Sequence, residues 1–167
     1  SMPNHILVAN RGEIAIRILR TAADQAIETS AIYAVDDEHA LHTRHADHSH
    51  SLGAEGVSAY LDQAGVLALA EANHCDAIHP GYGFLSESPE FAAACEAAGI
   101  NFIGPSAETL KLFGDKAQAR ALAESCDVPV LPGISRAITL AEAQNFFGQL
   151  DSGAVMLKAI AGGGGRG

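Results

Sequence analysis

The last ten residues of the chain combine a lysine with a run of glycines, a pattern that could hold a phosphate group. An apolar stretch at 154–160 contains Lys158 and leads into Gly162-Gly163-Gly164-Gly165-Arg166-Gly167. Glycine lets a backbone approach an anion with its N–H groups exposed, and a nearby lysine supplies positive charge for phosphate oxygens. The run is not a Walker A loop, since no Gly-Lys-Ser/Thr follows it. A flexible linker is the alternative, but the apolar strand and Lys158 ahead of the glycines favour phosphate binding.

A second candidate site is the loop His79-Pro80-Gly81-Tyr82-Gly83-Phe84-Leu85-Ser86-Glu87. It follows a short apolar stretch, and open α/β sheets bind ligands at the carboxyl ends of their strands. A proline and two glycines give the loop a defined shape, with an aromatic residue on each side of Gly83. The residues alone leave two readings open: a ligand-binding loop, or a turn whose aromatic side chains cover the core.

The tripeptide Gly114-Asp115-Lys116 is predicted to open a helix. That position would place Lys116 near the positive end of the helix dipole, where a lysine is repelled and suggests an anionic partner. The ordinary alternative is a lysine that faces solvent.

Five of the eight histidines crowd into one segment, at His39, His42, His45, His48 and His50. Steps of three residues do not keep three ligands on one helix face, and no carboxylate is placed as a clear fourth ligand. The pattern therefore favours a solvated or partly packed polar segment over a metal site.

The elements that must position these groups alternate between strand and helix. Apolar runs predict strands near 5–10, 29–35, 76–79 and 101–103, and helical spacing of apolar residues predicts helices at 13–24, 60–73 and 89–98. This alternation is typical of a doubly wound, mostly parallel, Rossmann-like α/β sheet, which we place at 4–113. A linker helix is predicted at 114–130, and a helix and a strand at 131–167 begin a further unit.

Composition narrows the class of protein. The 167 residues are 48% hydrophobic and 18% charged, which excludes an intrinsically disordered chain. The net charge of −10 argues against a nucleic-acid partner. No apolar run approaches the ~18 residues that span a bilayer and no signal peptide is apparent, so we expect a cytoplasmic protein without a membrane partner. Cys75, Cys95 and Cys126 fit buried thiols better than disulfides.

Several stretches together resemble the start of biotin carboxylase, the ATP-grasp component of biotin-dependent carboxylases such as those of acetyl-CoA, propionyl-CoA and pyruvate. The matching stretches are Ala9-Asn10-Arg11-Gly12-Glu13-Ile14-Ala15, His79 to Glu87, Phe102-Ile103-Gly104-Pro105, Gly114-Asp115-Lys116, Val128-Pro129 with Pro132-Gly133, and Lys158 to Gly167. They occur in family order over essentially the whole chain. The first two are the most specific.

The resemblance implies that the parent protein is a ligase that uses ATP, Mg²⁺ (or Mn²⁺) and bicarbonate to carboxylate biotin through carboxyphosphate. It implies a pre-ATP-grasp domain at 4–113, the start of an ATP-grasp lid at 131–167, and a homodimer. Its implied partners are a biotin carboxyl carrier protein and a carboxyltransferase domain or subunit. No nucleic acid or membrane is among them.

The resemblance also implies roles for individual residues. Lys116 and Lys158 match lysines that contact nucleotide phosphates, and Gly163, Gly164, Gly165 and Arg166 match the loop that closes over them. Tyr82, Gly83, Phe84 and Glu87 match the biotin and bicarbonate side of the cleft. Arg17, Arg20 and Asp24 match the helix that forms part of the dimer seam.

The family's magnesium-binding glutamates, catalytic arginines and bicarbonate site lie beyond the glycine run. The resemblance therefore implies no catalytic residue and no metal ligand among these 167 residues, and we expect the chain to fold without turning over. Two other classes stay open: an ATP-grasp ligase of the carbamoyl-phosphate synthetase type, and a non-catalytic α/β dimerisation module.

Overall fold

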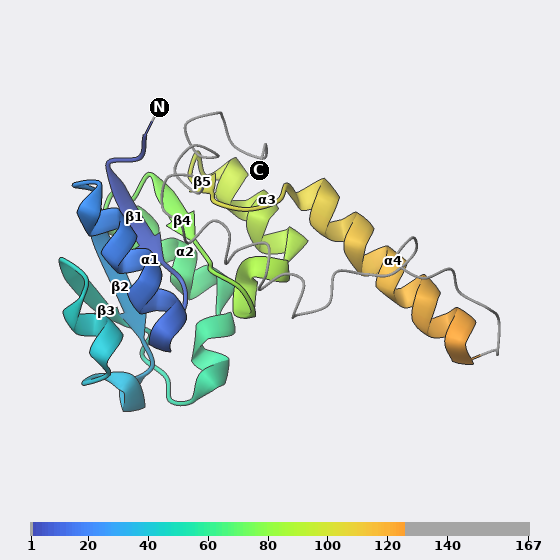
Figure 1. Cartoon of the computed structure of the whole chain (residues 1–167), viewed down its shortest axis with the longest axis horizontal. Coiled ribbons are helices and arrows are strands. Elements are labelled where there is room, and N and C mark those ends of the chain that lie inside the picture. The colour runs from blue at the N-terminus through green and yellow to red at the C-terminus, as the bar shows by residue number, and fades with distance from the viewer. Residues whose placement is uncertain (1, 126–167) are drawn as a thin grey trace.

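Alternating strands and helices build a five-stranded, all-parallel sheet in the computed structural model, which describes residues 2–125 (Figure 1). The strands are β1 (His5–Val8), β2 (Glu28–Tyr33), β3 (His48–Ser51), β4 (Ala77–His79) and β5 (Asn101–Phe102), in the spatial order β3-β2-β1-β4-β5. The α-helices are α1 (Gly12–Asp24), α2 (Gln63–Ala72), α3 (Pro89–Ala97) and α4 (Ala107–Ser125). Short 3₁₀ segments are η1 (Val35–Asp37), η2 (Leu41–Arg44), η3 (Val57–Leu61) and η4 (Phe84–Glu87). The predicted doubly wound, parallel α/β fold is confirmed.

Helices cover both faces of the sheet because successive strand residues point to opposite sides. Leu7 of β1 packs with Phe91 of α3 in one fully buried cluster, to which α2 also contributes. Ile6 of β1 packs with Ile18 and Leu19 of α1 in a second cluster on the other face. Continuous apolar strands buried on both faces are expected of a parallel sheet.

Helix α4 begins seven residues earlier than the tripeptide predicted to open it. Ser106 caps the helix, since its Oγ accepts a hydrogen bond from the N–H of Thr109 at 3.1 Å. Gly114, Asp115 and Lys116 consequently lie inside α4, so the prediction that Lys116 sits near the positive helix end is wrong. A glycine costs a helix only about 1 kcal/mol relative to alanine, which one capped and packed helix can absorb.

Two other segments differ from prediction. The helix expected at 60–73 is split: Tyr60 belongs to η3, and α2 begins after Asp62, whose carboxylate accepts from the N–H of Gly65 at 3.0 Å. Part of the histidine-rich segment forms the edge strand β3, where His48 and His50 alternate with serines. A strand of alternating polar residues carries no hydrophobic period from which it could have been predicted.

The two cysteines in the described part of the chain are free and buried, as predicted. Burial raises the pKa of the Cys75 thiol to about 11 and that of Cys95 to about 12, so neither is a reactive thiolate at neutral pH. Cys126, the last part of the predicted linker (126–130) and the predicted lid at 131–167 lie outside the described residues. Among residues 2–125, no helix combines the length and apolar character needed to cross a bilayer.

Candidate functional site

Asn10 joins the two turns that follow β1 and β4 at the carboxyl edge of the sheet. The side chain is fully buried, and its Nδ2 donates to the carbonyl oxygens of Pro80 at 2.8 Å and Tyr82 at 2.9 Å. Its Oδ1 accepts from the N–H of Arg11 at 2.8 Å. One amide therefore holds together the two sequence motifs that carry the most specific resemblance, at the edge where parallel α/β sheets bind ligands.

The loop from His79 to Glu87 adopts an unusual backbone. Gly81, Gly83 and Phe84 all have positive φ values, of 66°, 73° and 48°. A Cβ atom at Gly81 would lie 2.8 Å from both Asn10 Nδ2 and Ile14 Cγ2, so only glycine fits there. For Phe84 the left-handed conformation costs about 1–2 kcal/mol, and such strain collects at functional sites.

Arg11 is held in a network with Asp37 and Tyr60. Its Nε and terminal nitrogen each donate to the Asp37 carboxylate at 2.9 Å, and the Tyr60 hydroxyl donates to the same carboxylate at 2.7 Å. The hydrogen bond from Arg11 is the main reason that the pKa of Asp37 is lowered. Burial, aided by the bond to Asp37, raises the pKa of Tyr60 to about 12. The Arg11 charge is thus neutralised locally, which makes this cation part of the scaffold.

The Tyr60 ring connects this network to the loop after β4, because it contacts the ring of Phe84. It lies 5.5 Å from the Phe84 ring, with the planes tilted by 45°. This contact helps to hold Phe84 in its strained conformation. Asp37 and Tyr60 are not among the residues predicted from the sequence. The available signal for Asp37 was the acidic pair Asp36-Asp37 directly after the second predicted strand, at the same sheet edge as Arg11.

His79 supports the loop from inside the core. It is fully buried, and its Nδ1 accepts a hydrogen bond from the N–H of Gly81 at 3.0 Å. Burial lowers the pKa of His79 to about 3. The ring is therefore neutral at physiological pH and shapes the turn as a hydrogen-bond acceptor.

This buried imidazole predicts a loss of stability in acid. Because the folded pKa is about 3 and the ordinary value is 6.5, the unfolded chain alone binds the proton between those pH values. The free energy of unfolding is unaffected by this group above pH 6.5. Below pH 6.5 it falls by about 1.4 kcal/mol per pH unit, because the unfolded chain takes up the proton and the folded chain does not. Urea unfolding of the wild-type chain and of His79→Asn between about pH 7 and 5 measures it. The variant should show a shallower pH dependence by about one proton, and equal slopes would contradict this role of His79.

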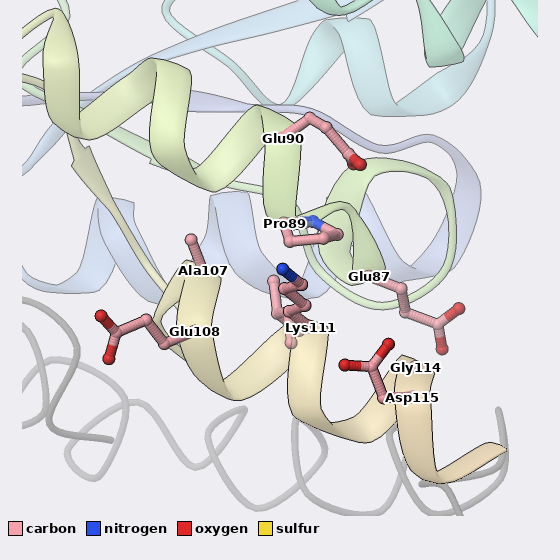
Figure 2. Close-up of a pocket in the computed structure, with 9 residues that line it drawn as sticks. Glu87, Pro89, Glu90, Ala107, Glu108, Lys111, Gly114 and Asp115 are labelled. Carbon is pink, nitrogen blue, oxygen red and sulfur yellow. The ribbon is translucent and has the colours of Figure 1, made fainter. Parts of the chain in front are cut away.

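A cleft of about 540 Å³ lies between the η4–α3 junction and α4 (Figure 2). Its lining residues are Glu87, Pro89, Glu90, Ala107, Glu108, Leu110, Lys111, Gly114 and Asp115. Lys111 extends from α4 toward Pro89 on the opposite wall, with the carboxylates of Glu87 and Asp115 to one side (Figure 2). Four carboxylates against one ammonium among these residues make the cleft acidic, so it suits a cation or a hydrogen-bond donor better than a bare anion.

The predicted site residues are only partly brought together. Glu87 lines the cleft, whereas Tyr82, Gly83 and Phe84 lie half-buried in the loop held by Asn10. Lys158, Gly163, Gly164, Gly165 and Arg166 lie outside the described residues.

Two lysines of α4 differ in their position relative to the cleft. Lys116 is half-buried on α4, and Lys111 is the lysine found in the cleft lining. Lys111 is not among the predicted site residues, because the sequence predicts that this helix opens at Gly114 and the helix in fact begins at Ala107. With the helix begun after Ser106, positions 107, 108, 111, 114 and 115 fall on one face at spacings of three and four.

The three residues predicted at the dimer seam share the outer face of α1. Arg17, Arg20 and Asp24 are exposed, on the side of the helix opposite the buried Ile18 and Leu19. Arg17 forms an ion pair with Glu13 one turn earlier, at 3.6 Å. The geometry leaves this face available to a second subunit, and the seam stays a prediction.

Comparisons of the sequence and of the structure with known proteins point to one family. The family model of the biotin carboxylase N-terminal domain matches residues 2–110. The chain is 48% identical over 165 residues to the pyruvate carboxylase of Bacillus subtilis, which covers 97% of this chain and 14% of that protein.

Solved structures that resemble this chain belong to the same family. The biotin carboxylase domain of a single-chain bacterial carboxylase has a TM-score of 0.68 and 48% identity, covering 87% of this chain and 34% of the other. The biotin carboxylase–beta-gamma-ATP complex from Campylobacter jejuni has a TM-score of 0.68 and 40% identity, covering 88% and 33%. This chain thus spans from 14% to 34% of the length of these relatives. The chain belongs to the biotin carboxylase N-terminal domain family.

Proposed function

We propose that this chain is the N-terminal part of a biotin-dependent carboxylase, which uses MgATP and bicarbonate to carboxylate biotin on a carrier protein. The observation that carries the proposal is the Asn10 side chain, which joins the turn after β1 to the loop after β4. Two stretches characteristic of the family are thereby assembled at the ligand-binding edge of the sheet. The Campylobacter jejuni relative, whose structure is a complex with an ATP compound, supports ATP as the nucleotide.

In this proposal the loop after β4 forms one wall of the biotin and bicarbonate site of the parent protein. Tyr82, Gly83, Phe84 and Glu87 would contribute to this wall, and the bonds from Asn10 hold the loop backbone in place. A wall held rigidly by buried hydrogen bonds can orient a substrate without reorganising during the reaction.

The described residues do not by themselves fit ATP. The cleft carries four carboxylates and one lysine, an arrangement that repels phosphate oxygens. The proposal therefore assigns the nucleotide phosphates to Lys116 together with Lys158, Gly163, Gly164, Gly165 and Arg166. The resemblance places the magnesium ligands beyond residue 167, and no described carboxylate is assigned to magnesium. When bound, the metal would neutralise charge on the phosphates.

The assembly proposed for the parent protein follows from the same family assignment. The exposed face of α1 with Arg17, Arg20 and Asp24 would contribute to a homodimer. A biotin carboxyl carrier protein and a carboxyltransferase would be the further partners, and the cytoplasm the location. The domain division into 4–113, 114–130 and 131–167 is part of the proposal.

The two assigned lysines predict a change in nucleotide affinity. Lys116→Ala and Lys158→Ala, each made in the full-length protein, are expected to raise the KM for ATP by about 10- to 100-fold, because each removes a charged hydrogen bond to phosphate. Steady-state kinetics at saturating bicarbonate and biotin measure this effect. Lys111→Ala is the matched control from the same helix, with an expected change below about twofold. An unchanged KM in both assigned variants would contradict the nucleotide assignment.

The proposed reaction is tested by the requirements of ATP hydrolysis. The full-length protein that carries this chain should hydrolyse ATP in the presence of bicarbonate, and free biotin should stimulate the rate. Stimulation by ammonia in place of biotin would contradict the proposal and indicate a ligase of the carbamoyl-phosphate synthetase type. Dimerisation without any ATP-linked stabilisation would instead indicate a non-catalytic module.

A further inference from the structure

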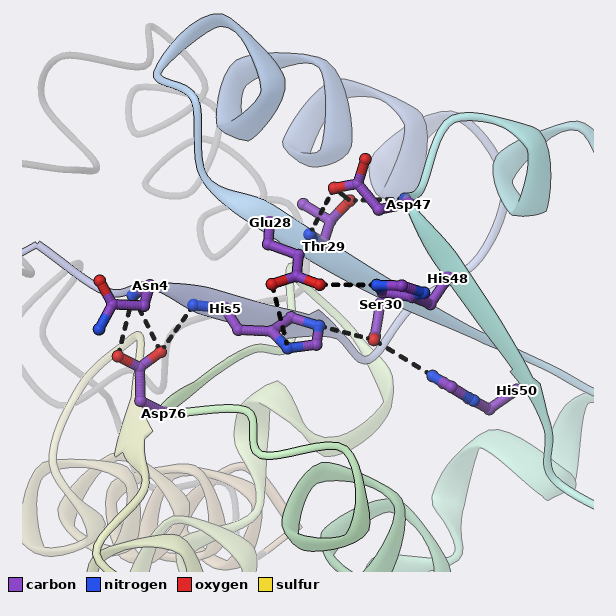
Figure 3. A network of polar contacts seen from close by, with 9 residues as sticks. All are labelled: Asn4, His5, Glu28, Thr29, Ser30, Asp47, His48, His50 and Asp76. Atoms are coloured by element: carbon purple, nitrogen blue, oxygen red, sulfur yellow. Dashed lines mark hydrogen bonds and ion pairs between the residues drawn. The ribbon is translucent and has the colours of Figure 1, made fainter.

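Three side chains that can bind metals meet at the end of the sheet opposite the cleft (Figure 3). His5, Glu28 and His48 are the first residues of β1, β2 and β3, which are neighbours in the sheet. In the parallel register His5 pairs with Glu28, and His48 pairs with Ser30, two residues after Glu28. Since paired residues and every second residue along a strand share a face, all three side chains project to the same side.

The ligand atoms are close enough to share one ion. His48 Nε2 lies 2.6 Å from Glu28 Oε1, and His5 Nδ1 lies 4.0 Å from Glu28 Oε2. All three ligand atoms fall within 4.8 Å of one another. Around a tetrahedral zinc ion with bonds of about 2.0–2.1 Å, ligand atoms are about 3.3 Å apart. The side chains of Glu28 and His48 are about half exposed, so small rotations can reach that spacing.

His5 is oriented by a buried partner. Its Nε2 lies 2.8 Å from Ser30 Oγ, so that Nδ1 faces Glu28. With the proton on Nε2, the serine hydroxyl accepts from His5 and donates its own proton to His50 Nε2, which lies 3.2 Å away. Nδ1 is then the unprotonated nitrogen. Metal-binding histidines are usually held in this way, by a hydrogen bond from the ring nitrogen that does not bind the ion.

Two further carboxylates hold the strand ends and are occupied in doing so. Asp76 accepts from the N–H of His5 at 2.9 Å, and Asp47 accepts from the N–H of Thr29 at 2.9 Å (Figure 3). Asp47 directly precedes His48, so its bond fixes the start of β3 against β2. The ligands are therefore carried by strand ends whose positions are tied down, as a metal site requires.

We propose that His5, Glu28 and His48 bind a divalent transition-metal ion of the zinc class, with solvent in the fourth position. Two imidazoles and one carboxylate suit zinc, whereas magnesium and calcium prefer oxygen ligands alone. Each ligand comes from a different strand, so the ion ties the polar edge strand β3 to the central strands. The site stands apart from the proposed carboxylase cleft, and its role is to stabilise the folded state by mass action.

The histidine-rich segment contributes one ligand of the three. His42 of the same segment is buried, with its Nε2 2.9 Å from the carbonyl oxygen of Ile32. The other two ligands come from residues 5 and 28, far away in sequence, so spacing within the segment could not reveal the site.

Metal binding to the tag-free 167-residue chain tests the proposal. After treatment with EDTA, and with thiols kept reduced, the chain is titrated with ZnCl₂ in competition with a chromophoric chelator. We expect one zinc ion per chain and a raised melting temperature. Titration with Co²⁺ should give the visible d–d bands of a tetrahedral site. Failure to bind either ion would overturn the proposal.

Variants of the two exposed ligands and of the buried Ser30 identify the side chains that hold the ion. His48→Gln and Glu28→Gln should each weaken zinc binding at least about tenfold and abolish the cobalt bands, and Ser30→Ala should weaken binding about tenfold. The matched control is His39→Gln, since exposed His39 lies 4.0 Å from the Glu38 carboxylate but outside the three-ligand cluster; its zinc affinity should be unchanged. Unaltered binding in His48→Gln, or thiolate-to-cobalt charge-transfer bands that show cysteine ligands, would overturn the proposal.

Discussion

Gly81→Ala is expected to lower the free energy of unfolding by about 3 kcal/mol. The backbone at this position has a φ of 66°, which costs an alanine about 1–2 kcal/mol. The new methyl group would also lie 2.8 Å from Asn10 Nδ2 and Ile14 Cγ2, and overpacking of this kind costs about 1–3 kcal/mol. Urea unfolding of the 167-residue chain measures the sum.

Gly99→Ala separates the two contributions. Gly99 has a similar φ of 74°, but a Cβ there would meet nothing within 4 Å. The free energy of unfolding of this control variant should fall only by the cost of the positive φ, about 1–2 kcal/mol. An equal decrease in the free energy of unfolding of the two variants would show that the close approach of Gly81 to Asn10 is not present in solution.

Asn10→Ala is expected to destabilise the chain by about 2–4 kcal/mol, because the carbonyl oxygens of Pro80 and Tyr82 lose their donor in a buried place. In the full-length protein the same change should release the loop after β4 and raise the KM for free biotin. Chemical unfolding measures the first effect and steady-state kinetics the second.

Two variants show whether the donor atoms of Asn10 matter or only its bulk. Asn10→Asp keeps the shape but turns a second acceptor toward the two carbonyls, so it should destabilise at least as much as Asn10→Ala. Asn73→Ala removes one amide donor to the carbonyl of Leu69 at a helix end and should cost about 1 kcal/mol. A stable Asn10→Asp variant would contradict the account of this contact.

Much of the fold could be predicted because its strands and helices carry strong periodic patterns. The apolar run after His5 and the helical spacing from Glu13 are both seen in β1 and α1. Pro89 at the first helical position and Gly99 after the last turn mark the ends of α3. In these segments local preference and tertiary packing favour the same conformation.

Other elements could not be predicted, because their local sequence is ambiguous or because tertiary contacts determine their conformation. Strand β3 alternates histidine with serine and is a strand because it pairs with β2 at the edge of the sheet. Helix α4 runs through Gly114, at which a glycine-based prediction breaks it.

The part of the candidate site that lies within one sequence motif could be predicted. The contacts that join motifs far apart in the sequence could not. The loop from His79 to Glu87 is recognisable as a string of residues. Its attachment to Asn10 spans about seventy positions of sequence, and the link from Arg11 to Asp37 spans 26. Contacts of this kind depend on strand order, which a single sequence does not state.

The function proposed for the parent protein is tested most directly by following the carboxyl group itself. The full-length protein is incubated with isotopically labelled bicarbonate, MgATP and free biotin, and labelled carboxybiotin is measured after separation at alkaline pH. We expect label in biotin that requires ATP and falls in the Asn10→Ala variant in parallel with biotin-stimulated ATP hydrolysis. A wild-type protein that hydrolyses ATP but leaves biotin unlabelled would contradict the proposed function.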